Sequence, residues 1–598
     1  MNLFVLAYSE HGHGESPILR QTLTDLTRDL PFFPGEKVAS WVAPSRSFAC
    51  AWIAHGPARV GGIRYVCGDD TRLALYVGRP ILWHSDKADG RTPLDPRFYL
   101  DATDDSLLAL DGRFAAARYN DATRALDLVT DPLGAYPLFE TAFRGTRLIS
   151  NNAEILRRLR GSRAPSLVAA AGLVAGGWPL NGDPLWETVT RVQGAGVHAI
   201  RGNRRSLRPS FDQDDPEVVF GSTFEPSQAA ALLVQNIRAL ADWPGRPSIV
   251  GVTAGRDSRL VLGAIVAAGV QACLLTGGQP DDADVRVGRL LAKAVGLPHV
   301  VDSTHIDPRL TDWRRTARVV DLMASGTVSL ADAHGYKLDA PVGPLSLWHS
   351  GQGGEIARGY YGTGARLDAE QLTRSLYRKF CRIRPGVAPP LSAEGERLVK
   401  GQIRNWVEQQ VASGFSPEDV PDLFYLKKRM GTWAGPGHGC AEYVRDTTSP
   451  LWSHRVVPLE LGLPSRQRVR ELFHLTVLAQ LEPRLVEVPF ERGNGWPSRR
   501  SPLRTRLQPL VHVLLELPDD LRRRAAALVP RNGNTVMARA LPGIRDVVLS
   551  EQHHPAWTVL DRPHVERLLR AEPDSLDFVR TTYVWNVATV FTAGLSTP

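Results

Sequence analysis

The chain has 598 residues, more than one hydrophobic core usually supports, so two or more domains are expected. An apolar content of 43% is ordinary for a folded chain. The net charge of +8 is due almost entirely to arginine. It predicts either a solvated basic surface or attraction for an anion such as ATP, an acidic peptide or nucleic acid. The sequence contains no RNA- or DNA-binding motif, so no nucleic acid partner is expected.

Membrane and export signals are weak. The longest apolar stretches, near residues 165–180 and 259–275, are interrupted by Gly, Ser or Gln and are too short to span a bilayer. The N-terminal stretch MNLFVLAYSE has no basic residue before its apolar run, so a signal peptide is not expected. The five cysteines lie far apart without a CxxC pair, as suits reduced thiols. We therefore expect a cytoplasmic protein with no membrane partner.

The first third of the chain alternates short apolar segments with turns. Strands are expected at residues 114–119, 125–129, 136–139 and 147–150. Their close spacing predicts antiparallel sheet. The polar, proline-punctuated stretch 201–227 is expected to be a linker, which gives a first domain at 1–205 and a second at 206–598.

Beyond the linker, apolar strands alternate with helical periods. Strands are expected at residues 247–252, 272–275 and 299–301, and helices at 258–268 and 282–295. Strand–helix–strand units of this spacing predict a doubly wound parallel α/β domain. From about residue 370 the pattern is mostly helical, and Arg and Leu crowd residues 504–530.

The segment TAGRDSR, residues 253–259, follows one expected strand and opens a helix. Backbone N–H groups and the helix dipole make such a turn an anion site. Gly255 lets the backbone approach a ligand, and Ser258 can donate a hydroxyl. Asp257 adds a carboxylate beside that anion, which calls for a cation such as Mg²⁺ between them. An ordinary helix cap by Asp257 or Ser258 is the alternative.

A second glycine-rich segment, WHSGQGGEIARGY at residues 348–360, follows the expected strand 344–348. It carries one acid, Glu355. Two strand ends with one carboxylate each could share a metal–pyrophosphate, so Asp257 and Glu355 are the candidate metal ligands. As a dinucleotide fingerprint GQGGEI is weak, because the third glycine is missing.

Together these segments resemble the asparagine synthetase superfamily. The SGGxDS pyrophosphate loop of that family is matched by residues 253–258 and its later SGxGxD-type loop by residues 350–355. Its N-terminal DPLGxxPL motif is matched by residues 131–138, preceded by LDGRFA at 110–115. The resemblance spans roughly residues 1–490. It implies an α/β protein: an Ntn-hydrolase-like antiparallel sandwich (a glutamine amidotransferase-like domain) before a doubly wound ATP-pyrophosphatase domain with a helical C-terminal part.

Three positions that differ from the family pattern indicate which branch of the family the chain resembles. Glutamine-dependent members carry a nucleophilic cysteine directly after the initiator methionine, where this chain has Asn2, so no glutaminase activity is expected. Gln352 stands where asparagine synthetases carry Glu and β-lactam synthetases tend to carry Tyr. The late lysine of both is missing, because no lysine follows Lys428; residues 470–481 offer Arg470, Glu471 and His474 instead. The chain most resembles lasso peptide cyclases.

That resemblance implies an ATP-dependent macrolactam synthetase. An Asp or Glu side chain of a ribosomal precursor peptide would be adenylated and then attacked by the peptide's N-terminal amine, releasing AMP and pyrophosphate. The implied cofactors are ATP and Mg²⁺; the implied partners are the precursor (core) peptide, a leader-binding protein and a leader peptidase. Two alternatives remain: an asparagine synthetase-like or β-lactam synthetase-like enzyme acting on a small molecule, and a non-catalytic binding module.

The resemblance also assigns site residues. The implied catalytic residues are Asp257, Ser258 and Glu355, of which Asp257 and Glu355 are the metal ligands. The implied ATP-binding residues are Val252, Thr253, Ala254, Gly255, Arg256, Asp257, Ser258, Leu275, Thr276, Ser350 and Gly351. Residues expected near the acceptor substrate are Gln352, Glu442, Tyr443 and His474.

Overall fold

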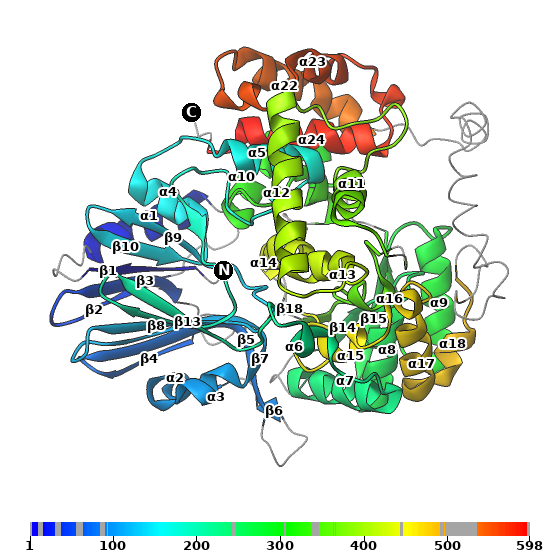
Figure 1. The fold of residues 1–598 in the computed structure, drawn as a ribbon, viewed down its shortest axis with the longest axis horizontal. Coiled ribbons are helices and arrows are strands. Elements are labelled where there is room, and N and C mark those ends of the chain that lie inside the picture. The colour runs from blue at the N-terminus through cyan, green and yellow to red at the C-terminus, as the bar shows by residue number, and fades with distance from the viewer. Residues whose placement is uncertain are drawn as a thin grey trace.

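A computed structural model gives the fold (Figure 1). It describes residues 3–9, 16–29, 37–54, 64–83, 90–91, 94–241, 247–303, 307–335, 346–362, 364, 366–442, 446–490, 496 and 535–594. Within these ranges no helix has the length and apolar character needed to cross a membrane.

Two antiparallel sheets form the first part of the chain. The first sheet, in the order β11-β9-β10-β1-β3-β2, contains β1 (Phe4–Tyr8), β2 (Lys37–Val42), β3 (Phe48–Ala54), β9 (Phe139–Phe143), β10 (Thr146–Ser150) and β11 (Thr190–Arg191). The second, in the order β13-β12-β8-β7-β5-β4 with β6 on β5, contains β4 (Arg64–Asp69), β5 (Arg72–Trp83), β6 (Gly90–Arg91), β7 (Leu110–Asn120), β8 (Ala125–Thr130), β12 (Gly196–Arg201) and β13 (Arg204–Pro209). Buried side chains from both sheets, among them Leu6, Trp52, Leu75 and Leu126, share one core, so the sheets form a sandwich.

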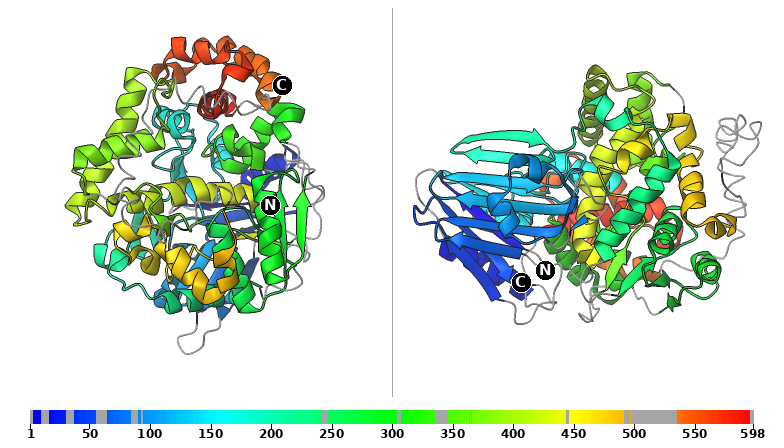
Figure 2. Two further views of the ribbon diagram at one scale, coloured as in Figure 1. Left: turned by 90° about the vertical axis from the view of Figure 1, so that its right-hand side faces the viewer. Right: turned by 90° about the horizontal axis from the view of Figure 1, so that it is seen from below.

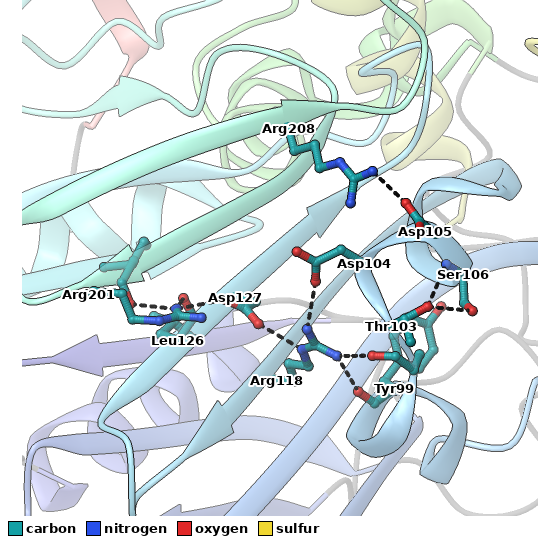
Figure 3. A network of polar contacts seen from close by, with 12 residues as sticks. Tyr99, Thr103, Asp104, Asp105, Ser106, Arg118, Leu126, Asp127, Arg201 and Arg208 are labelled. Atoms are coloured by element: carbon teal, nitrogen blue, oxygen red, sulfur yellow. Dashed lines mark hydrogen bonds and ion pairs between the residues drawn. The ribbon is translucent and has the colours of Figure 1, made fainter.

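A polar network centred on Arg118 links strands β7 and β8 of the second sheet to two short helices (Figure 3). Arg118 of β7 donates to the Asp127 carboxylate on β8 at 2.8 Å and to Asp104 at 3.0 Å. Its Nη1 also donates to the Ala102 carbonyl at 2.5 Å. Arg118 therefore fastens the short helices α2 (Arg97–Asp101) and α3 (Asp104–Leu108) to the sheet.

One strand was predicted too early. Residues 136–138 are not part of a strand, and β9 begins at Phe139. The reason is the turn at Asp131, whose carboxylate accepts hydrogen bonds from the backbone N–H groups of Leu133, Ala135 and Tyr136. Burial raises the pKa of Asp131 to about 6, although these N–H groups oppose the shift. The DPLG motif is thus a buried turn that delays the strand.

The predicted linker is also wrong, because it contains regular structure. Strand β13 pairs with β12 from Gly196↔Pro209 to Arg201↔Arg204, so the boundary predicted at residue 205 falls inside a hairpin. The stretch reads as polar because β13 is a sheet edge with almost every side chain exposed. Helices α6 (Pro216–Phe220) and α7 (Pro226–Ala241) follow.

The third sheet, after residue 247, is entirely parallel. Its order is β16-β15-β14-β17-β18, built from β14 (Ser248–Gly251), β15 (Ala272–Gly277), β16 (His299–Asp302), β17 (Leu347–His349) and β18 (Asp446–Thr448). From β14 the chain passes through α8 (Asp257–Ala268) to β15 and through α9 (Ala283–Val295) to β16, and it returns on the other side of β14 as β17. The strand order therefore reverses between β14 and β17, where open α/β sheets bind ligands. The predicted α/β fold class is confirmed.

The remaining helices pack around the sheets and on one another, and α22, α23 and α24 gather at the top of Figure 1 (see also Figure 2). They are α1 (Ser16–Asp29), α4 (Ala153–Arg160), α5 (Leu167–Gly176), α10 (Pro308–Ala324), η1 (Leu330–Gly335), η2 (Ile356–Arg358), α11 (Ala369–Phe380), α12 (Ala393–Ala412), α13 (Val420–Phe424), π-helix η3 (Tyr425–Ala434), α14 (Gly435–Glu442), α15 (Val457–Leu461), α16 (Ser465–Arg468), α17 (Leu472–Leu481), α18 (Pro483–Glu487), α22 (Thr535–Ser550), η5 (Pro555–Thr558), α23 (Arg562–Leu569), η6 (Pro573–Ser575) and α24 (Phe578–Thr592). Asn586 of α24 donates to the Val174 carbonyl of α5 at 3.1 Å, so α24 packs on a helix from the first 205 residues. The Arg- and Leu-rich stretch 504–530 lies outside the described residues.

Candidate functional site

The TAGRDSR segment follows β14 and opens α8, as predicted. The Thr253 N–H donates to Ser258 Oγ at 3.2 Å, and the Gly255 N–H donates to Thr253 Oγ1 at 3.1 Å, which closes the turn on itself. The Ala254 N–H donates to a carboxylate oxygen of Asp284, on α9, at 2.8 Å. A loop expected to bind an anion therefore already binds one internal carboxylate.

The second glycine-rich loop lies directly on the first. A Cβ atom added at Gly351 would lie 2.6 Å from the backbone nitrogen of Ser258, and one added at Gly354 would lie 2.7 Å from Asp257 Oδ1. Only glycine permits so close an approach. The Ser350 N–H donates to the Thr448 carbonyl at the end of β18 at 2.8 Å, which fixes the start of the loop.

Asp257 lies at the centre of the contact, at the first residue of α8. Its carboxylate accepts hydrogen bonds from His474 Nε2 at 2.8 Å and from Arg358 Nη2 at 3.1 Å. Burial raises the pKa of Asp257, but the His474 hydrogen bond and the Arg358 charge outweigh burial, so the pKa lies below its ordinary value. Asp257 is therefore an anion at neutral pH.

Glu355 lies on the other side of the same arginine. Its Oε1 accepts from Arg358 Nη2 at 3.2 Å, and its Oε2 accepts from the buried Tyr425 hydroxyl of η3. The Arg429 guanidinium lies over the Tyr360 ring at 4.8 Å and the Tyr425 ring at 5.8 Å. π-helical turns such as η3 are frequent at functional sites.

Arg256, the loop arginine, turns toward α17. It donates to Glu471, the residue before that helix, and its guanidinium lies over the Phe490 ring at 4.5 Å. Glu471 has a left-handed backbone, with φ 59°. The segment that lacks the family's lysine therefore supplies an acid to the loop.

Three side chains around Asp257 carry buried polar atoms that have no hydrogen-bond partner among the described residues: Gln352 Oε1, His474 Nδ1 and both carboxyl oxygens of Glu460. Burial, followed by the nearby charge of Asp257, raises the pKa of Glu460 well above its ordinary value. Buried groups without partners are rare in folded proteins and are candidates for ligand contact.

The residues expected along the nucleotide lie at the adjacent strand ends. The Val252 N–H donates to the Leu275 carbonyl at 3.0 Å. The buried Thr276 hydroxyl is already engaged, since it donates to the Val252 carbonyl at 3.0 Å and contacts His299 Nε2 at 2.9 Å. Leu275 is half-buried, whereas the Thr276 side chain is buried and already paired, so a ligand at these strand ends would meet Leu275 before Thr276.

The residues expected near the acceptor substrate lie in two different places. Gln352 and His474 belong to the loop contact, but Glu442 forms an ion pair with Arg113 of β7 at 2.6 Å. There it borders a cavity of about 30 Å³ that is also lined by Tyr136 and Asn151, on the side of the antiparallel sandwich. Tyr443 lies outside the described residues.

The Asp257 and Glu355 carboxylates are the candidate ligands of a metal ion. Across the described ranges, no group of three or more His, Cys, Asp or Glu side chains converges as a protein-only metal site. Mg²⁺ in nucleotide sites is commonly held by one or two carboxylates together with substrate phosphates. The Asp257–Glu355 pair has that composition. Both carboxylates already approach one cationic group, Arg358 Nη2, at 3.1 and 3.2 Å, so the residues present fit the ion.

Sequence patterns missed three residues at this contact. Arg358 lies three residues after Glu355 and is the only Arg or Lys in residues 348–360, so its position was a usable signal. Tyr425 lies 70 residues from Glu355, and no local pattern could join them. Asp284 looked like an ordinary acid in the first turn of a helix.

The chain has only distant likeness to known proteins. No protein-family model matches the chain, and no curated protein matches it. Two similar solved structures are the glutamine phosphoribosylpyrophosphate amidotransferase from B. subtilis complexed with ADP and GMP, and an allosteric regulatory enzyme of purine biosynthesis. Each has 12% identity and a TM-score of 0.23; the first alignment covers 60% of this chain and 77% of that chain, the second 63% and 78%. Likeness at this level defines neither a family nor an activity.

Proposed function

We propose that this chain is a lasso peptide cyclase, an ATP-dependent ligase that releases AMP and closes a macrolactam in a ribosomal precursor peptide. One observation carries the proposal: two glycine-rich loops, each with one carboxylate, meet where the parallel sheet reverses its strand order. The motif resemblance at these loops supports adenylation as the chemistry, and Asn2 removes the usual internal source of ammonia.

In this proposal Asp257 and Glu355 hold Mg²⁺, which neutralises phosphate charge when it is bound. The N-terminal end of α8 orients the leaving pyrophosphate through its positive dipole end. The Ala254 and Gly255 N–H groups join it only after they leave their present acceptors, Asp284 and Thr253. His474 keeps the Asp257 carboxylate in position through its 2.8 Å hydrogen bond. Ser258 holds the turn closed through Thr253.

The proposed reaction has two steps, adenylation of the carboxylate and attack by the amine. An oxygen of the peptide's Asp or Glu carboxylate bonds to the α-phosphorus of ATP, and the bond to pyrophosphate breaks. The N-terminal amine then bonds to the acyl carbon, AMP leaves with the acyl oxygen, and the amine loses one proton. An α-amine has a pKa of about 7.7–8.0, so roughly a tenth or more is neutral at pH 7 without a dedicated base.

The direct test combines the full chain with ATP, Mg²⁺, a cognate precursor, its leader-binding protein and its leader peptidase. Mass spectrometry should find a core peptide that has lost one water and yields no fragments within the ring. Free asparagine or a β-lactam with an untouched peptide would instead favour the small-molecule alternative. Absence of ATP–pyrophosphate exchange with every substrate would favour a binding module.

Glutamine is not expected to serve as a nitrogen donor. Asn2 supplies neither the thiol nor the hydroxyl that an N-terminal nucleophile needs; this residue lies outside the described ranges. Purified chain incubated with glutamine should release no glutamate above a no-protein control, as followed by a coupled glutamate assay. Turnover of glutamine would contradict the prediction.

Gly351→Ala should strongly reduce AMP formation while the protein stays folded. The added methyl group would meet the Ser258 nitrogen at 2.6 Å and force the two loops apart. Gly401→Ala, inside helix α12, is the matched control, because nothing lies within 4 Å of its Cβ position. Comparable activity in the two variants would show that loop contact is not required.

A further inference from the structure

One arginine nitrogen lies between the two carboxylates of the site. Arg358 Nη2 is 3.1 Å from Asp257 Oδ2 and 3.2 Å from Glu355 Oε1. The residue ends η2, and Gly359 follows it with φ 60°, so the backbone turns sharply away behind the side chain. Arg358 Nε is buried and has no hydrogen-bond partner among the described residues. Both carboxylates therefore pair with the guanidinium through the same nitrogen, Nη2.

The Arg358 guanidinium stays protonated at neutral pH. Burial lowers the pKa of the guanidinium, but the carboxylates of Asp257, Glu355 and Glu471 raise it further, so the net pKa lies above the ordinary value. A cation placed between Asp257 and Glu355 would lie beside this fixed positive charge. Two like charges about 4 Å apart repel appreciably even when water screens them.

We propose that Arg358 occupies the metal position while no nucleotide is bound, and that it moves onto phosphate oxygens when the metal enters with ATP. This inference rests on the proposed function. Guanidinium groups bind phosphate at least as well as carboxylate, often through two parallel hydrogen bonds, so a bound triphosphate offers Arg358 a replacement partner. The free chain then binds divalent cations weakly, and metal and nucleotide bind together.

The test measures metal binding rather than turnover. The full chain is titrated with Mn²⁺ in the absence of nucleotide, and free Mn²⁺ is followed by electron paramagnetic resonance. Arg358→Gln should lower the Mn²⁺ dissociation constant by about tenfold or more, which corresponds to about 1.4 kcal/mol. Arg358→Lys should resemble the wild type, because it keeps a positive charge. Arg366→Gln, an exposed arginine eight residues further on, should change nothing.

Two further variants make the result decisive. Arg358→Met removes the charge but keeps an aliphatic chain of similar length, and it replaces Arg358→Gln if that variant does not fold. Glu355→Gln in the Arg358→Gln background should abolish the gain in affinity, which locates the ion between the two loops. Equal Mn²⁺ affinity in wild type and charge-removed variants overturns the inference, even if the wild type forms AMP. A gain in affinity in a chain that never forms AMP supports the metal position and overturns the proposed cyclase.

Discussion

Asp257→Asn is expected to lower the rate of AMP formation by about 10²–10³, a loss of roughly 2.7–4 kcal/mol of transition-state stabilisation. The substitution keeps the shape of the side chain and leaves an oxygen for the His474 hydrogen bond, so the fold should be retained. What disappears is the negative charge that faces Arg358 across 3.1 Å and that would balance a cation beside the phosphates. ATP–pyrophosphate exchange and AMP release are the measurements.

Asp281→Asn is the control for Asp257→Asn. It makes the same chemical change at an exposed acid in the connection that follows β15 and should leave the rate unaltered. If Asp257→Asn keeps more than about a tenth of the wild-type rate, less than ~1.4 kcal/mol is lost and a central role for this carboxylate is ruled out. Formation of ADP in place of AMP would contradict adenylation altogether.

The parallel sheet could be predicted well because its pattern is local. Strands β14, β15 and β16 and helices α8 and α9 begin and end within a few residues of the expected positions, since apolar runs and helical periods mark each of them. The antiparallel part was predicted less well. Strand β13 has a polar sequence because it is an exposed edge, and β9 is delayed by a buried turn; neither cause is visible in periodicity.

The candidate site could be predicted only in part. Asp257 and Glu355 each follow an apolar strand, which made both of them candidates, but their contact requires β14 and β17 to be neighbours, and sequence spacing does not give strand order. Glu442 looked equally suitable, yet it pairs with Arg113 because α14 packs against the antiparallel sandwich. Partners such as Tyr425 depend on tertiary packing, which short motifs do not encode.

A second arginine, Arg468, supports the fold near this site. It is 1% exposed, and its Nε donates to Asp422 Oδ2 at 2.8 Å while Asp422 itself is fully buried. Its other nitrogens donate to Asp419 and to the backbone carbonyls of Leu461 and Leu463. Burial raises the pKa of Asp422 to about 6 even though the Arg468 charge opposes the shift. The folded chain therefore depends on this arginine to hold a buried anion.

Arg468→Met should destabilise the fold by about 3–5 kcal/mol near neutral pH, because it leaves the Asp422 charge buried without its partner. The loss should be smaller at about pH 5. With its pKa raised further in the variant, Asp422 binds a proton there and becomes neutral, whereas the unfolded chain releases that proton as pH rises above about 4. Denaturant unfolding at both pH values measures the difference. Arg466→Met, an exposed arginine on the same helix, is the control and should cost less than about 0.5 kcal/mol. An equal loss at the two pH values would show that packing of the arginine, and not its charge, stabilises this region.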